Sequence, residues 1–141
     1  MKKREAKFDT ELQKWLKHNP HILNCENAHI ETKVIVGDSP FNFKSGFKPH
    51  QLPTLINARR GIFVHKWSDI GRITQPFDIT FSYQTNTWVV LKWERKGNNK
   101  FYFLNPMTIQ GMIYDGKKSI YEHEAEQYAD IIGELGVVHN I

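Results

Sequence analysis

The order of helical and extended segments along the chain constrains its fold more than any other feature. Apolar side chains recur at the helical period between residues 3 and 18, and an Asn-Pro pair ends that segment. A predicted strand from residue 27 to 36 follows, and a second predicted helix runs from about residue 49 to 60. An apolar strand begins after Gly61, so the first half of the chain reads helix, strand, helix, strand.

The second half of the chain is predicted to be mostly extended. The segments FDITFSY and WVVLKWE, joined by the turn QTNT, predict a hairpin, and RKGNNK leads to a further strand, FYFL. A last helix is expected from about Ser119 to Leu135, with Ser119 as its cap and Glu122 completing a capping box. The whole order predicts an α/β or α+β fold with a central mixed β-sheet flanked by helices, in one domain over residues 1–141.

Composition favours a globular protein outside the membrane. Hydrophobic residues make up 40% of the chain and charged residues 24%, and no apolar stretch approaches the length that spans a bilayer. The single cysteine, Cys25, excludes an internal disulfide framework and a cysteine-based zinc site. The expected location is therefore the cytoplasm, or the host cytoplasm if a phage encodes the chain. The net charge of +4 suits a phosphate-bearing partner only slightly and argues against an acidic mimic of nucleic acid.

Glu31 and Lys33 carry the strongest chemical signal. They stand two apart in a predicted strand, so their side chains project from the same side. A carboxylate that binds Mg²⁺ and a lysine that stabilises developing phosphate charge are what phosphodiester cleavage needs. A solvated Glu-Lys pair on an edge strand is the alternative, and an isolated E-x-K occurs by chance in many proteins.

Two further acids are candidates for the same site. Asp78 follows a proline at the start of a predicted strand, where it can stand at the edge of a cleft or simply cap the preceding turn. Glu5 lies on the same helix face as Phe8 and Leu12, so it points toward the protein. An acid in the first turn also stabilises any helix through the macrodipole.

Basic side chains gather around the second predicted helix. A lysine, a histidine and the amide of Gln51 at its N-terminus would suit a phosphate contact, although ordinary capping is more common there. The residues expected to hold a DNA backbone in a salt-sensitive way are Lys44, Lys48, His50, Arg59, Arg60 and Lys66.

The stretches HIETKV, KPHQLPTLINARRGIFVHKWSD and QPFDI together resemble the PD-(D/E)XK nuclease superfamily, especially small phage-encoded proteins related to Holliday-junction resolvases. In such resolvases an E-x-K strand precedes a helix with a His-Gln pair near its start and then an apolar strand after glycine. That pattern covers about residues 29 to 69 here. The resemblance implies a restriction-endonuclease-like core, with Glu31 as a ligand of Mg²⁺ or Mn²⁺ and Lys33 as the catalytic lysine. It also implies that Gln51 lies near the active centre and that Glu5 is an accessory ligand.

The chain departs from this family at the aspartate, which the family supplies on a strand before the E-x-K motif. Asp78 would complete the metal site with Glu31 only if its strand lies beside the E-x-K strand. Glu94 and Lys96 form a second E-x-K motif downstream of Asp78, in the usual order of the family, but they abut a turn where charged residues are expected anyway.

The expected function is a Mg²⁺- or Mn²⁺-dependent DNA endonuclease acting on branched or recombination intermediates. The family also implies a homodimer, because a two-fold junction calls for paired sites. Two other classes stay open. One is a catalytically inactive nuclease-fold protein that binds DNA, and the other is a phage protein-interaction factor that acts on a host component.

Overall fold

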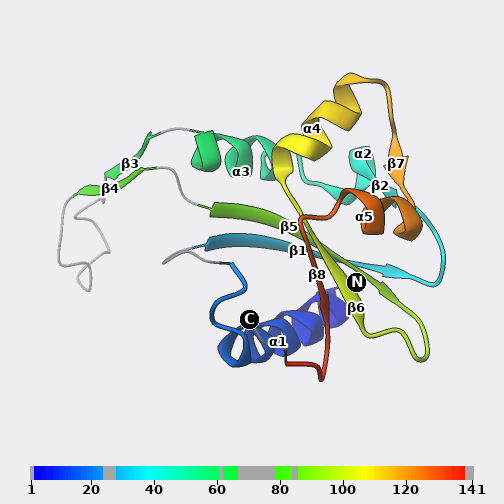
Figure 1. Cartoon of the computed structure of the whole chain (residues 1–141). Helices are drawn as coiled ribbons and strands as arrows, with labels where there is room; N and C mark the ends of the chain where they lie inside the picture. The colour runs from blue at the N-terminus through cyan, green and yellow to red at the C-terminus, as the bar shows by residue number, and fades with distance from the viewer. Residues whose placement is uncertain (1, 24–27, 61, 67–78, 84–85, 139–141) are drawn as a thin grey trace.

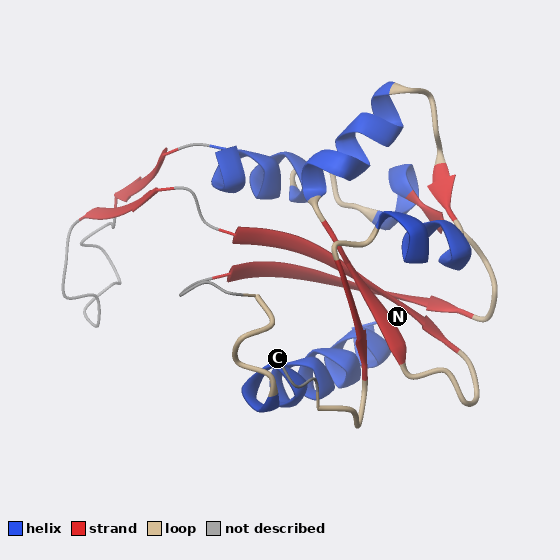
Figure 2. Ribbon diagram, viewed as in Figure 1, coloured by secondary structure: helices blue, strands red, loops and turns tan. Residues whose placement is uncertain are grey.

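The computed structural model describes residues 2–23, 28–60, 62–66, 79–83 and 86–138 (Figure 1). Its centre is a four-stranded mixed sheet in the order β1-β5-β6-β8 (Figure 2). These strands are β1 (Ala28–Val36), β5 (Asn86–Glu94), β6 (Lys100–Leu104) and β8 (Ile131–Glu134). Strands β1 and β5 run parallel, whereas the β5–β6 and β6–β8 pairs are antiparallel. The predicted mixed sheet flanked by helices is therefore confirmed.

Helices cover both faces of this sheet (Figure 1). On one face lies α1 (Lys2–His18), whose Phe8, Leu12 and Trp15 are buried against β5 and β6. On the other face lie α3 (Gln51–Arg60), α4 (Pro106–Tyr114) and α5 (Glu122–Tyr128). The predicted helices 3–18 and 49–60 are confirmed, the second beginning at Gln51.

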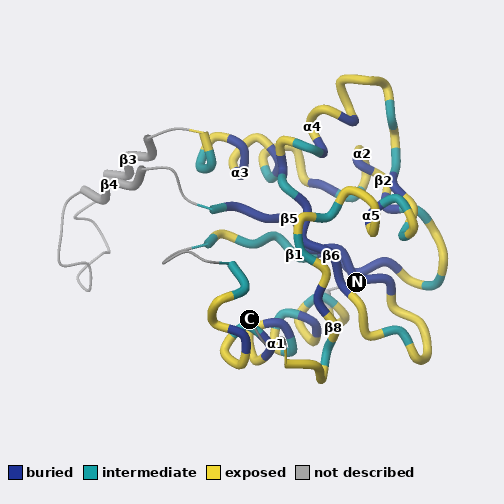
Figure 3. Tube along the Cα trace, in the orientation of Figure 1, coloured by how far each residue is buried: buried dark blue, intermediate teal, exposed yellow. Residues whose placement is uncertain are grey.

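The central strands are the most buried part of the molecule. Figure 3 shows β5 and β6 dark along most of their length, and only their end residues are not buried. Strand β1 is at the edge of the sheet and is buried only toward its end, at residues 33–35. Side chains alternate along β1, so Val34 packs on the α1 face and Ile35 packs on the α3 face. Lys33 has the same parity as Ile35 and points to the α3 face.

The predicted hairpin of FDITFSY and WVVLKWE is wrong. Strand β4 (Ile79–Tyr83) pairs with β3 (Ile62–Lys66) in a separate two-stranded antiparallel sheet. Strand β5 instead pairs with β1 along its whole length and with β6 at Val89–Leu91.

The predicted helix from Ser119 to Leu135 is right only over α5 and wrong at both ends. That segment divides into β7 (Ser119–Ile120), α5 and β8, and β7 pairs with β2 (Phe41–Asn42). The helix begins one turn later than predicted, where the Glu124 carboxylate accepts the Tyr121 N–H at 3.0 Å. It ends before β8 because Phe103 and its neighbours in β6 take Ile131 and Ile132 as strand partners.

Asparagine side chains cap two of the helices, α2 (Phe43–Gly46) and α4. Helix α2 follows β2, and Asn42 caps it by accepting the Lys44 and Ser45 N–H groups, both at 3.0 Å. Helix α4 was not predicted, although Asn105 caps it and Pro106 occupies its first turn. Among the described residues, no helix is both long and apolar enough to cross a membrane.

Candidate active site

Glu31, Lys33 and Gln51 meet on the face of the sheet that α3 covers. Gln51 Nε2 donates to Glu31 Oε1 at 2.8 Å, and Lys33 Nζ donates to Gln51 Oε1 at 3.0 Å. Lys33 Nζ also lies 3.3 Å from Glu31 Oε1. The three side chains therefore close a triangle, which we call the Glu31–Lys33–Gln51 group. Strand β1 presents its acid and its base on one side, and the first residue of α3 joins them.

The backbone ahead of α3 fixes the orientation of the Gln51 amide. The Lys48 N–H donates to Gln51 Oε1 at 2.9 Å, and the Gln51 N–H in turn donates to the Lys48 carbonyl at 3.1 Å. The amide oxygen thus receives two donors, Lys33 and the Lys48 backbone, while the amide nitrogen donates to Glu31. A flipped amide would turn its NH₂ group toward both donors, so this network selects one orientation.

Burial excludes the solvated-pair interpretation of Glu31 and Lys33. The Lys33 side chain is only 11% exposed, and that of Glu31 is 30% exposed. An ammonium group this far from water is costly unless charged or polar partners satisfy it. Gln51 and Glu31 supply those partners, and the Phe47 ring adds a cation–π contact with its centroid 5.8 Å from Nζ.

Glu5 lies at the same edge of the sheet. It lines a cavity of about 300 Å³ together with Glu31, Thr32 and Asp9, and the Thr32 hydroxyl donates to the Asp9 carboxylate. It also lines a neighbouring cavity of about 500 Å³ that contains Lys33. Helix α1 therefore places Glu5 beside cavities that Glu31 and Lys33 also line. Asp9 was missed, although it follows Glu5 by one helical turn and so shares its face.

The carboxylate oxygens at this edge are of the type that binds Mg²⁺, but there are few of them in the part of the chain that the structure describes. Magnesium prefers oxygen ligands and is usually held by one or two carboxylates plus waters. Glu31 Oε1 takes both of the bonds described above, and Oε2 accepts no hydrogen bond from any described residue. Within the described ranges, no three acidic, histidine or cysteine side chains converge closely enough to hold a metal. Asp78, the predicted third ligand, lies outside the described residues.

The second E-x-K motif lies away from this group. Glu31 is opposite Val89 in the β1–β5 register, whereas Glu94 is opposite Val36. Five residues of strand separate the two levels, which is roughly 16 Å. Glu94 and Lys96 are exposed, and Glu94 pairs with Arg4 at 3.7 Å. Glu94 and Lys96 therefore fit the alternative interpretation, in which they are ordinary charged residues at the end of a strand.

The predicted DNA-contacting residues divide into exposed and engaged side chains. Lys44, Lys48, His50 and Arg60 are exposed around α2 and α3. Lys66 belongs to β3.

Arg59 is used within the fold. Its guanidinium donates to the Thr87 carbonyl, at 2.7 Å from Nη2, and lies over the Trp88 ring with its central carbon 4.6 Å from the centroid. Burial lowers the pKa of Arg59, and the nearby Asp130 carboxylate opposes that shift. Arg59 therefore joins α3 to β5.

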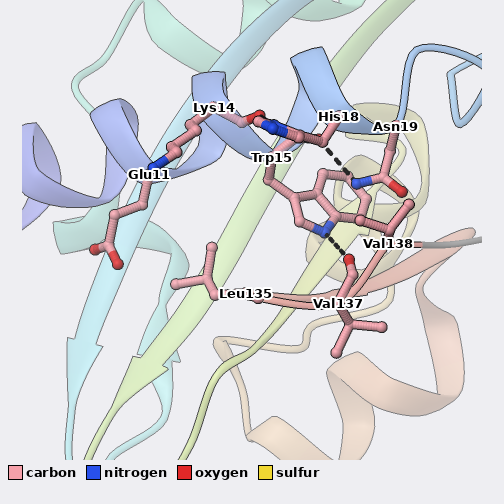
Figure 4. Close-up of a pocket in the computed structure, with 9 residues that line it drawn as sticks. Glu11, Lys14, Trp15, His18, Asn19, Leu135, Val137 and Val138 are labelled. Carbon is pink, nitrogen blue, oxygen red and sulfur yellow. Dashed lines mark hydrogen bonds between the residues drawn. The ribbon is translucent and has the colours of Figure 1, made fainter.

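A separate cavity of about 360 Å³ lies beside the C-terminal half of α1 (Figure 4). Its lining includes Trp15, Asn19 and Leu135, and the Trp15 indole N–H donates to the Val137 carbonyl at 3.0 Å. This bond fastens the end of the described chain to α1. No residue of the Glu31–Lys33–Gln51 group lines this cavity.

Comparison of the chain with protein-family models, curated proteins and solved structures finds no match.

Proposed function

We propose that this protein is a Mg²⁺- or Mn²⁺-dependent endonuclease that cleaves DNA and has a restriction-endonuclease-like core. The observation that carries the proposal is the Glu31–Lys33–Gln51 group. In this group an acid lies beside a buried ammonium, and one amide is hydrogen-bonded to both. An E-x-K motif that arises by chance does not need such a network. Lys33 is buried yet lines the cavity of about 500 Å³, so its side chain borders space that a substrate phosphate can enter.

Each side chain has a distinct role in this proposal. Lys33 stabilises the negative charge that develops on the phosphate in the transition state, and its burial strengthens that interaction. Gln51 holds Lys33 and Glu31 at a fixed separation. Glu31 holds the metal with Glu5, and Asp78 is the proposed third ligand. The metal, when bound, supplies a water of lowered pKa and polarises the phosphate.

The same proposal assigns the exposed cations to the DNA backbone. Lys44 in α2 and Lys48 and His50 ahead of α3 precede the N-terminus of α3, and Lys48 lines the cavity that contains Lys33. Arg60 is exposed at the other end of α3. Branched or recombination DNA is the proposed substrate, and a homodimer is the proposed form, since paired sites suit a two-fold junction.

A cleavage assay tests the proposal. Labelled four-way junction and linear duplex are incubated with wild-type protein in Mg²⁺, in Mn²⁺ and with a chelator. We expect cleavage only with metal, and Lys33→Ala to slow it by about 100-fold or more, because it removes a preorganised transition-state contact. Lys96→Ala is the matched control, since it alters the lysine of the other E-x-K motif, and it should cut like wild type.

Binding measurements separate the alternatives. DNA that is bound but never cut in either metal, with Glu31→Ala binding unchanged, would establish the inactive DNA-binding class. No DNA affinity even at about 50 mM salt, where phosphate contacts are strong, would favour the protein-interaction class. Circular dichroism of Lys33→Ala checks that lost cleavage does not reflect lost folding.

A further inference from the structure

A second cavity, rich in lysine, lies beside the one that contains Lys33. It measures about 600 Å³ and lies between α2 and the segment that joins α4 to β7. Its lining includes Asn42, Phe43, Ile113, Lys44, Lys117 and Lys118, and no acidic residue in the described part of the chain lines it. We call it the lysine groove.

Backbone hydrogen bonds bring these lysines together from distant parts of the sequence. Asn42 pairs with Ser119 in the β2–β7 ladder, and the Phe43 N–H donates to the Lys118 carbonyl at 3.0 Å. Lys44 follows directly in α2, whose cap is Asn42. On the other side, the Lys117 N–H donates to the Met112 carbonyl at 2.9 Å, which folds the chain back after α4. The groove is therefore fixed by main-chain geometry.

The charges in the lysine groove are only partly compensated. Lys117 pairs with Glu124, and that ion pair accounts for one cation. Lys44 and Lys118 are exposed, and neither ammonium pairs with a carboxylate in the described part of the chain. Asp115, an acid on the turn after α4, does not line the groove. These two uncompensated cations, one from α2 and one from the segment before β7, both line the groove and attract an anion.

The lysine groove continues the cavity at Lys33. Asn42 lines both cavities, and α2 forms the wall between them, with Lys44 on one side and Ser45 and Gly46 on the other. A polyanion that passes Lys33 and Lys48 can therefore cross α2 and reach Lys44 and Lys118. A sugar–phosphate backbone has this form, since it carries a charge at every nucleotide.

We propose that the lysine groove binds the sugar–phosphate backbone of DNA beyond the segment held at Lys33, through Lys44 and Lys118. This inference rests on the proposed function for the direction in which the DNA runs. It adds Lys118 as a contact residue and extends the DNA-binding surface from α3 to β7.

The test compares two double variants in DNA-binding titrations without metal, over a range of salt concentrations. The first is Lys44→Gln with Lys118→Gln. The second is Lys14→Gln with Lys17→Gln, which removes two exposed lysines from α1 on the opposite face of the sheet. We expect the groove variant to bind about 10-fold more weakly, with the slope of log affinity against log salt reduced by roughly two, because each lost phosphate contact lowers the slope by about one. The α1 variant should keep the wild-type slope.

The outcomes distinguish the groove from the nuclease proposal. Equal affinities and slopes in wild type and the groove variant overturn the groove, whether or not the wild type cleaves DNA. A groove-dependent slope in a protein that never cleaves DNA with Mg²⁺ or Mn²⁺ supports the groove and overturns the nuclease. Urea unfolding of both variants checks the fold, and both should resemble wild type because all of the altered side chains are exposed.

Discussion

Gln51, the first residue of helix α3, connects this helix to strand β1 through side-chain hydrogen bonds. Its amide bonds Lys33, Glu31 and the Lys48 backbone at 2.8–3.0 Å. In Gln51→Ala, Glu31 is the one close polar partner that Lys33 keeps among the described residues, so we expect the free energy of unfolding to fall by about 1–3 kcal/mol. We also expect slower cleavage, because the ammonium is no longer held in place. Urea denaturation and single-turnover kinetics measure the two effects.

A matched change on another helix controls for that prediction. Gln110 is exposed on α4, so Gln110→Ala should alter stability by no more than about 0.5 kcal/mol and leave cleavage unchanged. Wild-type stability and wild-type cleavage in Gln51→Ala would show that the Glu31–Lys33–Gln51 group does not depend on its amide.

Arg59 and Arg60 are adjacent in sequence but belong to different environments. Arg59 donates to the Thr87 carbonyl and stacks on Trp88, whereas Arg60 is exposed. We expect Arg59→Met to lower the free energy of unfolding by about 1–2 kcal/mol. Arg60→Met should leave stability unchanged and weaken DNA binding with a shallower salt slope. The two variants, compared by thermal unfolding and DNA titration, should therefore show opposite patterns. Equal loss of stability in both would contradict the role assigned to Arg59.

At the scale of elements, local periodicity predicts those helices and strands whose own residues decide their conformation. The apolar stripe of α1 and the strand β1 follow from spacing alone, and alternation correctly places Glu31 beside Lys33. The partner Gln51 comes from the family resemblance. Phe47 and the Lys48 N–H give no signal in the sequence, because their contacts depend on the turn that leads into α3.

The failed element predictions have a common physical cause. Strand β8 forms because β6 offers it an edge, and Gly133 allows the approach, since an added Cβ would lie 2.3 Å from the Phe101 ring. Strand β4 pairs with β3, and β5 pairs with β1 along its whole length. Pairing between distant segments overrides local preference in both cases. Helix α4, in contrast, carried a readable Asn105-Pro106 start.

Helix α2 contains Gly46, which packs closely against the Phe41 ring, and substitution of this glycine tests that contact. A Cβ on Gly46 would lie 2.3 Å from the Phe41 ring, which is buried and packs edge-on against Phe47. We expect Gly46→Ala to cost about 1–3 kcal/mol of stability through overpacking, and to slow cleavage because Phe47 contacts Lys33. Chemical denaturation and cleavage rates measure this.

Gly111 provides the control for that substitution. It lies in α4, and an added Cβ would meet no atom within 4 Å. Gly111→Ala should therefore raise the free energy of unfolding by about 0.5–1 kcal/mol, as expected for glycine replaced inside a helix. If both alanine variants changed stability by the same amount and sign, the close contact at Gly46 would not be a real constraint.

At the scale of the whole molecule, Glu122 joins three elements of the fold. Its carboxylate accepts from Tyr102 in β6 at 2.8 Å, from Asn98 at 3.1 Å, and from Arg95 after β5. Burial alone would raise the pKa of Glu122, but the hydrogen bonds from Arg95, Tyr102 and Asn98 outweigh it and hold the pKa below its ordinary value of 4.5. Burial, followed by the bond to Glu122, raises the pKa of the Tyr102 hydroxyl. Helix α5 is thereby attached to the β5–β6 hairpin through a charged acceptor.

Because the folded protein holds the pKa of Glu122 below that of the unfolded chain, the stabilisation is fully present above about pH 4.5 and is lost as the pH falls through the folded pKa. Glu122→Gln should therefore lower the free energy of unfolding by about 1–3 kcal/mol at pH 7, and this deficit should shrink toward pH 3 as the wild-type carboxyl takes up a proton. Urea midpoints across this pH range measure the change. Glu126→Gln alters an exposed acid on the same helix and should show no deficit at either pH. A Glu122→Gln deficit of equal size at pH 7 and pH 3 would mean that the shape of the side chain, and not its charge, attaches α5 to the sheet.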